Sequence, residues 1–239
     1  MVRRVALEMK YVLVTGAGSG LGYELTRLHA EQGWFVFALY RSVSDRLTEL
    51  AKAHPDNILP LPCDVASTDA VNAAMDAVKA RTDRLDRIFN NAGIHRFKDW
   101  CTLEEAELDF CKVMFDINAV GPLRIVKAAI PLLREGSCII NISSEAASIE
   151  GTKGVTNYAY SMSKAGMNMG ARIMDNWLIG RGIRTLMIHP GRMRTAMKGA
   201  HSDVDPWDVA AQLMSLVDRI HLIPEDQKYM DYQGKPYKW

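Results

Sequence analysis

A short apolar segment that leads directly into a glycine-rich turn strongly limits the folds open to this chain of 239 residues. Residues Tyr11 to Thr15 have the composition of a buried parallel strand, and Gly16, Gly20 and Gly22 follow them. A helix-like stretch then runs from Tyr23 to Glu31. Because glycine has no side chain, the backbone of such a turn can approach a pyrophosphate, whose charge the amides at the helix N-terminus stabilise. The pattern predicts a strand, a phosphate-binding turn and a helix.

Apolar segments alternate with helix-like stretches along the rest of the chain. Strands are predicted near residues 11–15, 34–39, 58–62, 86–90, 138–143 and 184–189, with a further candidate around 228–232. Long helices are predicted over 108–133, where Pro122 would cause a kink or a break, and over 158–178. This alternation predicts a parallel sheet with helices on both faces, with ligands bound beyond the carboxyl ends of the strands.

Composition and charge fit a single α/β domain over residues 1–239, with residues 1–8 as a candidate disordered lead-in. Apolar residues make up 48% of the chain, which is enough for one sizeable core, and no linker or internal repeat divides it. The formal net charge is +1 without a long basic run, so we expect neither nucleic-acid nor anionic-membrane binding. No segment resembles a membrane span or a secretory signal, which predicts a cytoplasmic protein.

The cysteines and histidines do not predict a metal site. Cys63, Cys101, Cys111 and Cys138 form no C-x-x-C pair and have no histidines clustered with them. We expect buried or unreactive thiols and no bound metal. His95 and His189 are isolated in the sequence, and a structural role is expected for each.

The pair Tyr160 and Lys164 is the first candidate for catalysis. Two residues four positions apart share one face of a helix, so a phenol and an ammonium would point into the same space. A free tyrosine ionises near pH ~10, and a nearby cation favours the phenolate, which brings the hydroxyl closer to acid–base chemistry at neutral pH. Tyr158 lacks such a partner, because Met162 stands four positions after it.

Further polar motifs follow the predicted strands in a characteristic order. They are Tyr40-Arg41, Cys63-Asp64-Val65, Asn90-Asn91-Ala92-Gly93, Ser143-Ser144 and Pro190-Gly191-Arg192-Met193-Arg194-Thr195, with Asn118 in a predicted helix. The glycine turn departs from the G-x-G-x-x-G fingerprint, because Leu21 stands at the third glycine. From about Lys10 to Trp239, the whole set resembles the short-chain dehydrogenase/reductase family. The resemblance implies a Rossmann-like, doubly wound parallel sheet of about seven strands with helices on both faces.

Two segments narrow the resemblance to one branch of this family. The stretch between Ser144 and Tyr160 is longer than usual, and is similar to that of the C-factor and sniffer-type carbonyl reductases. The final residues, Met230 to Trp239, are similar to the Gly-x-Pro-x-x-Trp-like tail of that branch. The same aromatic tail could instead be a strand and clamp that closes the core.

The resemblance implies a catalytic group of four residues. Tyr160 is implied as the proton donor to a carbonyl oxygen, which Ser144 holds by a hydrogen bond. Lys164 is implied to shift the acidity of Tyr160 and to bind the ribose hydroxyls, and Asn118 to anchor a water chain that resupplies the proton. The family pattern makes the second serine catalytic, so Ser143 is expected to support the backbone.

The resemblance also implies a set of cofactor-binding residues. They are Gly16, Ser19, Gly20, Leu21, Arg41, Asp64, Val65, Asn91, Ala92, Gly93, Tyr160, Lys164, Pro190, Gly191 and Thr195. Asp64 is implied to accept a hydrogen bond from the adenine amino group, residues 91–93 to line the adenine ribose side, and Thr195 to hold the carboxamide.

NADP(H) is expected rather than NAD(H). An NAD-dependent chain of this fold has a carboxylate at the end of the second strand, whereas Tyr40 stands there in this sequence. The guanidinium of Arg41 follows and is shaped to bind a 2′-phosphate. A solvated loop cation is the alternative interpretation of Arg41.

The expected function is the reduction of an aldehyde or ketone to an alcohol. A nucleotide-binding regulatory or signalling protein with little turnover is one alternative, and an alcohol dehydrogenase working in the oxidative direction is another. The complete set of Ser144, Tyr160, Lys164 and Asn118 favours catalysis, since a protein that only binds needs no acid. The expected partner is a small carbonyl or alcohol substrate.

A homodimer or homotetramer is also expected. In the family that the chain resembles, the two long helices pair across a two-fold axis. Here those helices contain apolar residues beyond what one core face requires, such as Ile125, Ala129, Met167 and Ile173.

Overall fold

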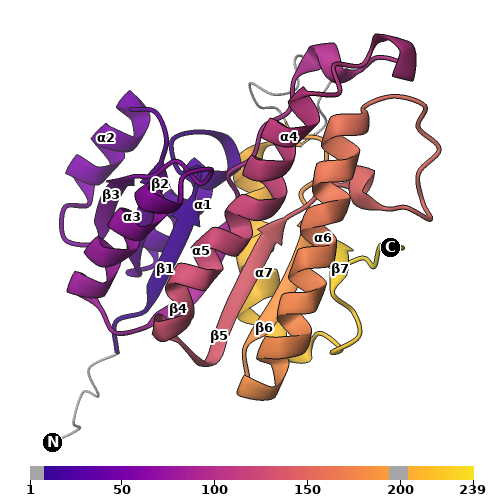
Figure 1. Ribbon diagram of the computed structural model, residues 1–239. Coiled ribbons are helices and arrows are strands. Elements are labelled where there is room, and N and C mark those ends of the chain that lie inside the picture. The colour runs from indigo at the N-terminus through magenta and orange to yellow at the C-terminus, as the bar shows by residue number, and fades with distance from the viewer. Residues whose placement is uncertain (1–7, 194–203) are drawn as a thin grey trace, which may run out of the picture.

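One parallel sheet lies at the centre of the molecule (Figure 1). The computed structural model describes residues 8–193 and 204–239, so the predicted lead-in lies outside the described residues except for Glu8. The strands are β1 Tyr11–Thr15, β2 Phe35–Tyr40, β3 Ile58–Pro62, β4 Leu85–Asn90, β5 Leu133–Ile142, β6 Arg184–His189 and β7 Tyr229–Asp231. Their spatial order is β3-β2-β1-β4-β5-β6-β7, and every neighbouring pair is parallel. The predicted doubly wound Rossmann-like fold is therefore confirmed, with its switch point between β1 and β4.

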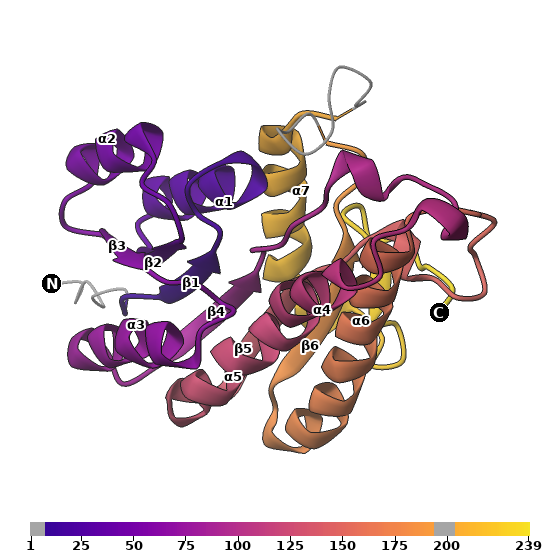
Figure 2. The same ribbon diagram turned by 45° about the horizontal axis from the view of Figure 1, so that its top comes forward.

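Helices cover both faces of this sheet (Figures 1 and 2). The helices are α1 Gly20–Glu31, α2 Asp45–Ala53, α3 Thr68–Arg81, α4 Phe110–Phe115, α5 Gly121–Ala129, α6 Tyr158–Leu178 and α7 Pro206–Asp218. Short 3₁₀ turns span Phe97–Asp99, Leu103–Glu105, Ile130–Leu132, Glu145–Ala147, Ile179–Arg181 and Ile220–Leu222.

Strand alternation divides the core into two layers. Leu13 packs in the layer that contains residues of α3, α5 and α6, whereas Val12 and Val14 pack in the layer that contains residues of α1, α2 and α7. Because both faces of the central strands are covered, β1 and β2 are almost wholly apolar rather than alternating in polarity, whereas β4 also contains the buried Arg87. Among the described residues, no helix has both the length and the apolar character needed to cross a membrane.

The helix predicted over 108–133 is interrupted by a π-helical segment, η3, at Asp116–Val120 between α4 and α5. Pro122 lies in the first turn of α5 and has no N–H to donate to the preceding turn. The Arg124 guanidinium bonds the Asp116 backbone carbonyl at 3.3 Å and the Asp116 carboxylate at 2.6 Å. The prediction of a helix with a kink or a break at Pro122 is thereby corrected: a wider π turn precedes Pro122 and accommodates it without a break.

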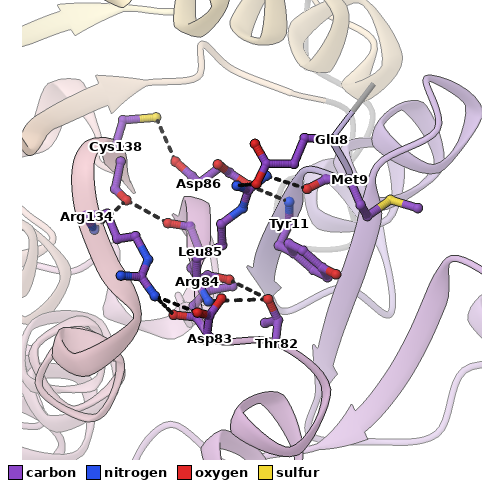
Figure 3. A network of polar contacts seen from close by, with 11 residues as sticks. Glu8, Met9, Tyr11, Thr82, Asp83, Arg84, Leu85, Asp86, Arg134 and Cys138 are labelled. Atoms are coloured by element: carbon purple, nitrogen blue, oxygen red, sulfur yellow. Dashed lines mark hydrogen bonds and ion pairs between the residues drawn. The ribbon is translucent and has the colours of Figure 1, made fainter. Parts of the chain in front are cut away.

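A polar network at the amino ends of the strands fixes where β4 and β5 begin (Figure 3). Asp86 accepts from the Tyr11 backbone N–H at 2.7 Å, and the Ser137 hydroxyl donates to the Leu85 carbonyl at 2.7 Å. The Arg134 guanidinium bonds the carboxylate of Asp83 at 2.9 Å. Pairing therefore starts at Leu85 and Leu133 with a register shift, so β5 begins earlier than the predicted residue 138.

Candidate active site

A cleft of about 700 Å³ lies at the carboxyl ends of the strands, as the topology predicts. The predicted site residues that line it are Gly16, Ser19, Gly20, Leu21, Arg41, Asp64, Val65, Asn91, Ala92, Gly93, Tyr160, Lys164 and Pro190. Gly191 follows Pro190 with a φ of +76° and packs close to Tyr232. Ser144 and Asn118 contact the lining residues, and Thr195 lies outside the described residues.

The glycine turn requires glycine for two different reasons. Gly16 and Gly20 have φ values of +68° and +53°, which residues with a Cβ rarely adopt. Gly22 lies against the turn itself, since a Cβ at this position would be 2.3 Å from the Gly16 carbonyl oxygen. Ser19 precedes α1, and among the described residues its side chain makes no capping hydrogen bond to the helix. The first amides of α1 are therefore available to an anion in the cleft.

Asn91 holds this turn in place from the end of β4. Its Nδ2 donates to the Thr15 carbonyl at 2.9 Å and to the Gly16 carbonyl at 3.4 Å. The Thr15 hydroxyl accepts in return from the backbone amides of Asn91 and Ala92, at 3.0 and 2.9 Å. Thr15 is a residue that the sequence interpretation left out of the site, although it stands directly before the glycine turn.

The loop after β2 forms the other end of the cleft. Arg41 is exposed there, and Tyr40, Ser42, Val43 and Ser44 also line the wall. The Ser44 hydroxyl donates to the Gly18 carbonyl at 2.7 Å and accepts from the Leu47 amide as the N-cap of α2. Sequence reasoning missed Ser42 and Ser44, although a serine shortly before an amphipathic stretch is a recognisable N-cap signal.

Asp64 lines the cleft beyond this loop, and one of its carboxylate oxygens has a structural contact. Oδ1 accepts a hydrogen bond from the Ala66 amide at 2.9 Å. The carboxylate is thereby held in a fixed orientation at the end of β3, which is the position implied for a contact with adenine.

Tyr160 and Lys164 lie in the first two turns of α6 at the cleft wall, where Lys164 is buried and Tyr160 is half-buried. The Lys164 Nζ donates to the Ile142 carbonyl at 2.7 Å and lies 5.9 Å from the centroid of the Tyr160 ring. Burial lowers the pKa of Lys164 to about 8. Burial also raises the pKa of Tyr160, and a hydrogen bond with the Ser144 side chain opposes this effect. The expectation that Lys164 lowers the tyrosine pKa is therefore wrong: desolvation has the largest effect on the pKa of Tyr160, and the opposing effect comes from Ser144 and not from Lys164.

Asn118 is fixed by the π-helical segment behind the cleft wall. Its Nδ2 donates to the Ile94 carbonyl at 2.9 Å and to the Ser163 hydroxyl at 3.0 Å, and its Oδ1 accepts from the Ile94 amide at 2.8 Å. A Cβ on Gly93 would lie 3.1 Å from Asn118 Oδ1 and 3.6 Å from Lys164 Nζ. Gly93 therefore allows Asn118 and Lys164 to approach the same point of the chain.

The two adjacent serines have different partners. The Ser143 hydroxyl donates to Asn168 Oδ1 at 2.7 Å in the buried layer beneath α6. The Ser144 side chain hydrogen-bonds Tyr160. In the described part of the chain, Tyr160 rather than Tyr158 belongs to the cleft wall. Ser143 also lines the cleft, whereas Ser144 reaches it through Tyr160, so the choice of Ser144 as the catalytic serine stays a prediction.

His95 lies in the cleft, which a purely structural interpretation did not anticipate. Its ring centroid is 4.6 Å from that of Tyr160. The Trp100 indole donates to His95 Nε2 at 2.7 Å, and the same Nε2 lies 3.1 Å from Asn157 Oδ1. Phe97 and Met193 also line this end; Met193 belongs to the predicted motif after β6, whereas no sequence signal marked Phe97.

His189, Cys63 and Cys138 are buried in the fold. His189 is buried, and its Nδ1 accepts from the Glu145 amide at 3.1 Å. Burial raises the pKa of the Cys63 and Cys138 thiols to about 11. Within residues 8–193 and 204–239, no group of three or more histidines, cysteines and acidic residues is arranged to hold a metal ion.

Comparison with known proteins identifies the family. The short chain dehydrogenase model matches residues 10–205 of this chain. The chain belongs to the short-chain dehydrogenase family. The C-signal protein of Myxococcus xanthus is 32% identical to this short-chain dehydrogenase over 166 residues, which are 68% of this chain and 98% of that protein. The 3-oxoacyl-[acyl-carrier-protein] reductase FabG of Thermotoga maritima is 33% identical over 196 residues, 80% of this chain and 77% of that protein.

Solved structures of carbonyl reductases are similar to this short-chain dehydrogenase over nearly its whole length. The NADPH-bound carbonyl reductase from chicken fatty liver has a TM-score of 0.86 at 28% identity, and covers 98% of this chain and 100% of its own. The carbonyl reductase Sniffer of D. melanogaster has a TM-score of 0.87 at 27% identity, with 97% and 100% covered. The predicted resemblance to the C-factor and sniffer-type branch is confirmed.

Proposed function

We propose that this short-chain dehydrogenase reduces an aldehyde or ketone to an alcohol, with NADPH as the hydride source and Tyr160 as the proton donor. The observation that carries this proposal is the contact between Tyr160 and Ser144 at the cleft wall, with Lys164 buried beside them. Similar proteins named as carbonyl reductases and as an oxoacyl reductase support the reductive direction.

The cleft suits NADP(H). It extends from Arg41 after β2, past the uncapped start of α1, to Tyr160 and Lys164. Gly22 lies too close to the Gly16 carbonyl oxygen for a Cβ to fit. The turn that would hold the pyrophosphate therefore has no side chain at this position. The chicken carbonyl reductase is bound to NADPH, and a similar carbonyl reductase from Pseudomonas aeruginosa is in complex with NADP. These structures support the expectation of NADP(H) over NAD(H).

Arg41 is the residue proposed to bind the 2′-phosphate. Its position directly after β2 places a guanidinium on the cleft wall, and Ser42 and Ser44 add hydroxyls to the same loop. No carboxylate stands at the end of β2 to repel a phosphate, since Tyr40 occupies that position.

The residues of this chain then divide the chemistry as follows. NADPH, when bound, supplies the hydride. The Tyr160 hydroxyl gives its proton to the carbonyl oxygen, and because burial raises its pKa, the hydroxyl is protonated at neutral pH. The Ser144 hydroxyl orients Tyr160 and holds the carbonyl oxygen. The Lys164 ammonium stabilises the negative charge that develops on Tyr160.

Asn118 completes the proposed site as the residue that keeps the Ile94 and Ser163 segments together behind the cleft. We propose that it also anchors the water chain through which the Tyr160 proton is replaced.

A test of this function measures NADPH oxidation by absorbance across aldehydes, ketones, diketones and quinones. Tyr160→Phe should lower kcat on the order of 10²- to 10⁴-fold, because it removes the proton donor, and should leave NADPH binding nearly unchanged. Tyr158→Phe is the matched control from the same turn of α6 and should keep the parent activity. Turnover like that of the parent in Tyr160→Phe would exclude this tyrosine as the donor.

A signalling function is the second candidate, because C-signal is among the similar proteins. It predicts tight nucleotide binding without NADPH oxidation on any substrate of the panel. The same measurements therefore separate the two candidates.

We propose that the protein assembles as a homodimer through the outer surface of α4, α5 and α6, which lie side by side in Figure 1. Of the residues chosen from the sequence for such a contact, Ile125, Ala129 and Met167 are instead buried in the core, and only Ile173 is exposed. The exposed apolar residues on this surface are Val113, Phe115, Leu123, Met162, Met169, Ile173 and Trp177. Their number on one surface of the molecule supports a protein partner.

A further inference from the structure

The C-terminal residues fold back over the segment that contains Ser144. We call residues 229–239 the C-terminal clasp. The Tyr237 amide donates to the Tyr229 carbonyl at 2.9 Å, and the Trp239 carbonyl accepts from the Glu150 amide at 2.7 Å. The rings of Tyr237 and Trp239 lie 5.4 and 5.6 Å from that of Tyr229, measured between centroids. Figures 1 and 2 show this C-terminal end beside the loop between β5 and α6.

Tyr229 is the member of the clasp that reaches the catalytic segment. It lies on β7, is 2% exposed, and its hydroxyl donates a short hydrogen bond to the main-chain carbonyl of Ser144. Burial raises the pKa of Tyr229 well above its usual value, so the hydroxyl remains a donor at any pH used for an assay.

The backbone around Ser144 is held from other sides as well. The Ser143 amide donates to the Ile188 carbonyl at 2.7 Å, and the Glu145 amide donates to His189 Nδ1 at 3.1 Å. Tyr229 binds the Ser144 carbonyl between these two amides. The backbone of each of residues 143, 144 and 145 therefore has a hydrogen-bond partner. The Ser144 Oγ in turn accepts from the Ala146 amide at 3.2 Å, so its direction depends on this peptide and on the turn that follows it.

We propose that Tyr229 is a positioning residue for Ser144: its hydrogen bond to the Ser144 carbonyl directs the serine hydroxyl toward Tyr160. The inference rests on the proposed function, since it assumes that Ser144 and Tyr160 act on a carbonyl. Loss of this bond removes one of three hydrogen bonds that hold the peptide between Ser144 and Glu145; the others run from the Ala147 amide to the Ser144 carbonyl at 3.0 Å and from the Glu145 amide to His189 Nδ1 at 3.1 Å. A displacement of about 1 Å at a reacting group can cost ~10²-fold in rate. Cofactor binding does not involve this peptide.

The test is a double-mutant cycle between Tyr229→Phe and Ser144→Ala, with kcat measured by NADPH oxidation and NADPH affinity by fluorescence titration. Tyr229→Phe keeps the ring and removes the hydroxyl. It should lower kcat at least tenfold in the parent background and less than twofold in the Ser144→Ala background, because Tyr229 acts through Ser144. The dissociation constant of NADPH should change less than twofold in both. Tyr237→Phe removes a hydroxyl from the same ring cluster and is the control that should keep parent kcat.

Two outcomes would overturn the proposal. One is a parent-like kcat in Tyr229→Phe, and the other is a loss of kcat that comes with an equal loss of NADPH affinity, which indicates a general structural role. If Tyr229→Phe does not fold, as judged by thermal unfolding, Trp239→Ala replaces it, because this half-exposed ring packs on Tyr229. It should reproduce the selective loss of kcat. A parent enzyme that reduces none of the carbonyls refutes the proposed function itself, which is a different result.

Discussion

Replacing Lys164 with methionine tests how much stability the protein gives up to keep a charge in its active site. The variant keeps an unbranched side chain of similar length and removes the ammonium. Burial lowers the lysine pKa from the ordinary 10.5 to about 8. At about 1.4 kcal/mol per pKa unit, the charged form destabilises the folded state on the order of 3 kcal/mol.

The sign of the pH dependence follows from this direction. The folded state binds the Lys164 proton less tightly than the unfolded state, so protonation favours unfolding. The penalty is fully present below pH 8 and declines as the pH rises from about 8 toward 10.5. The hydrogen bond from Nζ to the Ile142 carbonyl, worth roughly 1.5–3 kcal/mol for a charged donor, offsets part of it. We therefore expect the free energy of unfolding of Lys164→Met to be about 1 kcal/mol higher than that of the parent at pH 7.

The assay is urea unfolding by circular dichroism at pH 7, 8, 9 and 10, without cofactor because a bound ligand would stabilise the fold. Lys164→Met should change from about 1 kcal/mol more stable than the parent at pH 7 to about 1 kcal/mol less stable at pH 10, while carbonyl reduction is lost throughout. Lys112→Met, at an exposed lysine of α4, is the control and should show no such pH dependence. A stability difference that stays constant from pH 7 to pH 10 would refute the reasoning.

Two further predictions concern the cofactor and the assembly. Arg41→Ala should raise the KM for NADPH tenfold or more, about 1.4 kcal/mol on the affinity scale, and barely change that for NADH, whereas Tyr40→Asp should favour NADH. Equal weakening of both cofactors in steady-state kinetics would show that Arg41 does not bind the phosphate. Sedimentation at micromolar concentration should give the mass of two or four chains, and Ile173→Glu with Trp177→Glu should shift it to one; a single-chain mass for the parent would contradict the assembly.

The sheet could be predicted from local patterns because most of its strands contain a run of apolar residues, such as residues 12–14 and 35–39. The helix predicted over 158–178 coincides with α6, Tyr158–Leu178, and β6 lies where it was expected, at Arg184–His189. The π-helical segment could not be predicted, because the apolar pattern around Pro122 also fits a regular helix. Its extra width depends on Arg124 contacts that form only in the fold.

The site residues that have a local sequence pattern could be predicted. Those that reach the site only through packing between distant parts of the chain could not. The glycine turn, Asn91 and the Tyr160–Lys164 pair all have local signatures. Tyr229 is 85 residues from Ser144 in the chain, and no spacing rule connects them. Periodicity shows which residues of α5 and α6 form an apolar helix face, but it does not show whether that face lies on the core or on the surface. Ile125 was therefore assigned to the surface, although it is buried in the core.

The hydroxyl of Ser44 has a consequence for redesign of cofactor preference. It joins the loop after β2 to the glycine turn through the Gly18 carbonyl and also starts α2. Exchanging the whole loop for one from an NADH-dependent enzyme would therefore loosen the pyrophosphate turn along with the ribose contact. Substitutions confined to Tyr40 and Arg41 leave this hydrogen bond intact, so an engineered library should vary these two positions and keep Ser44 constant.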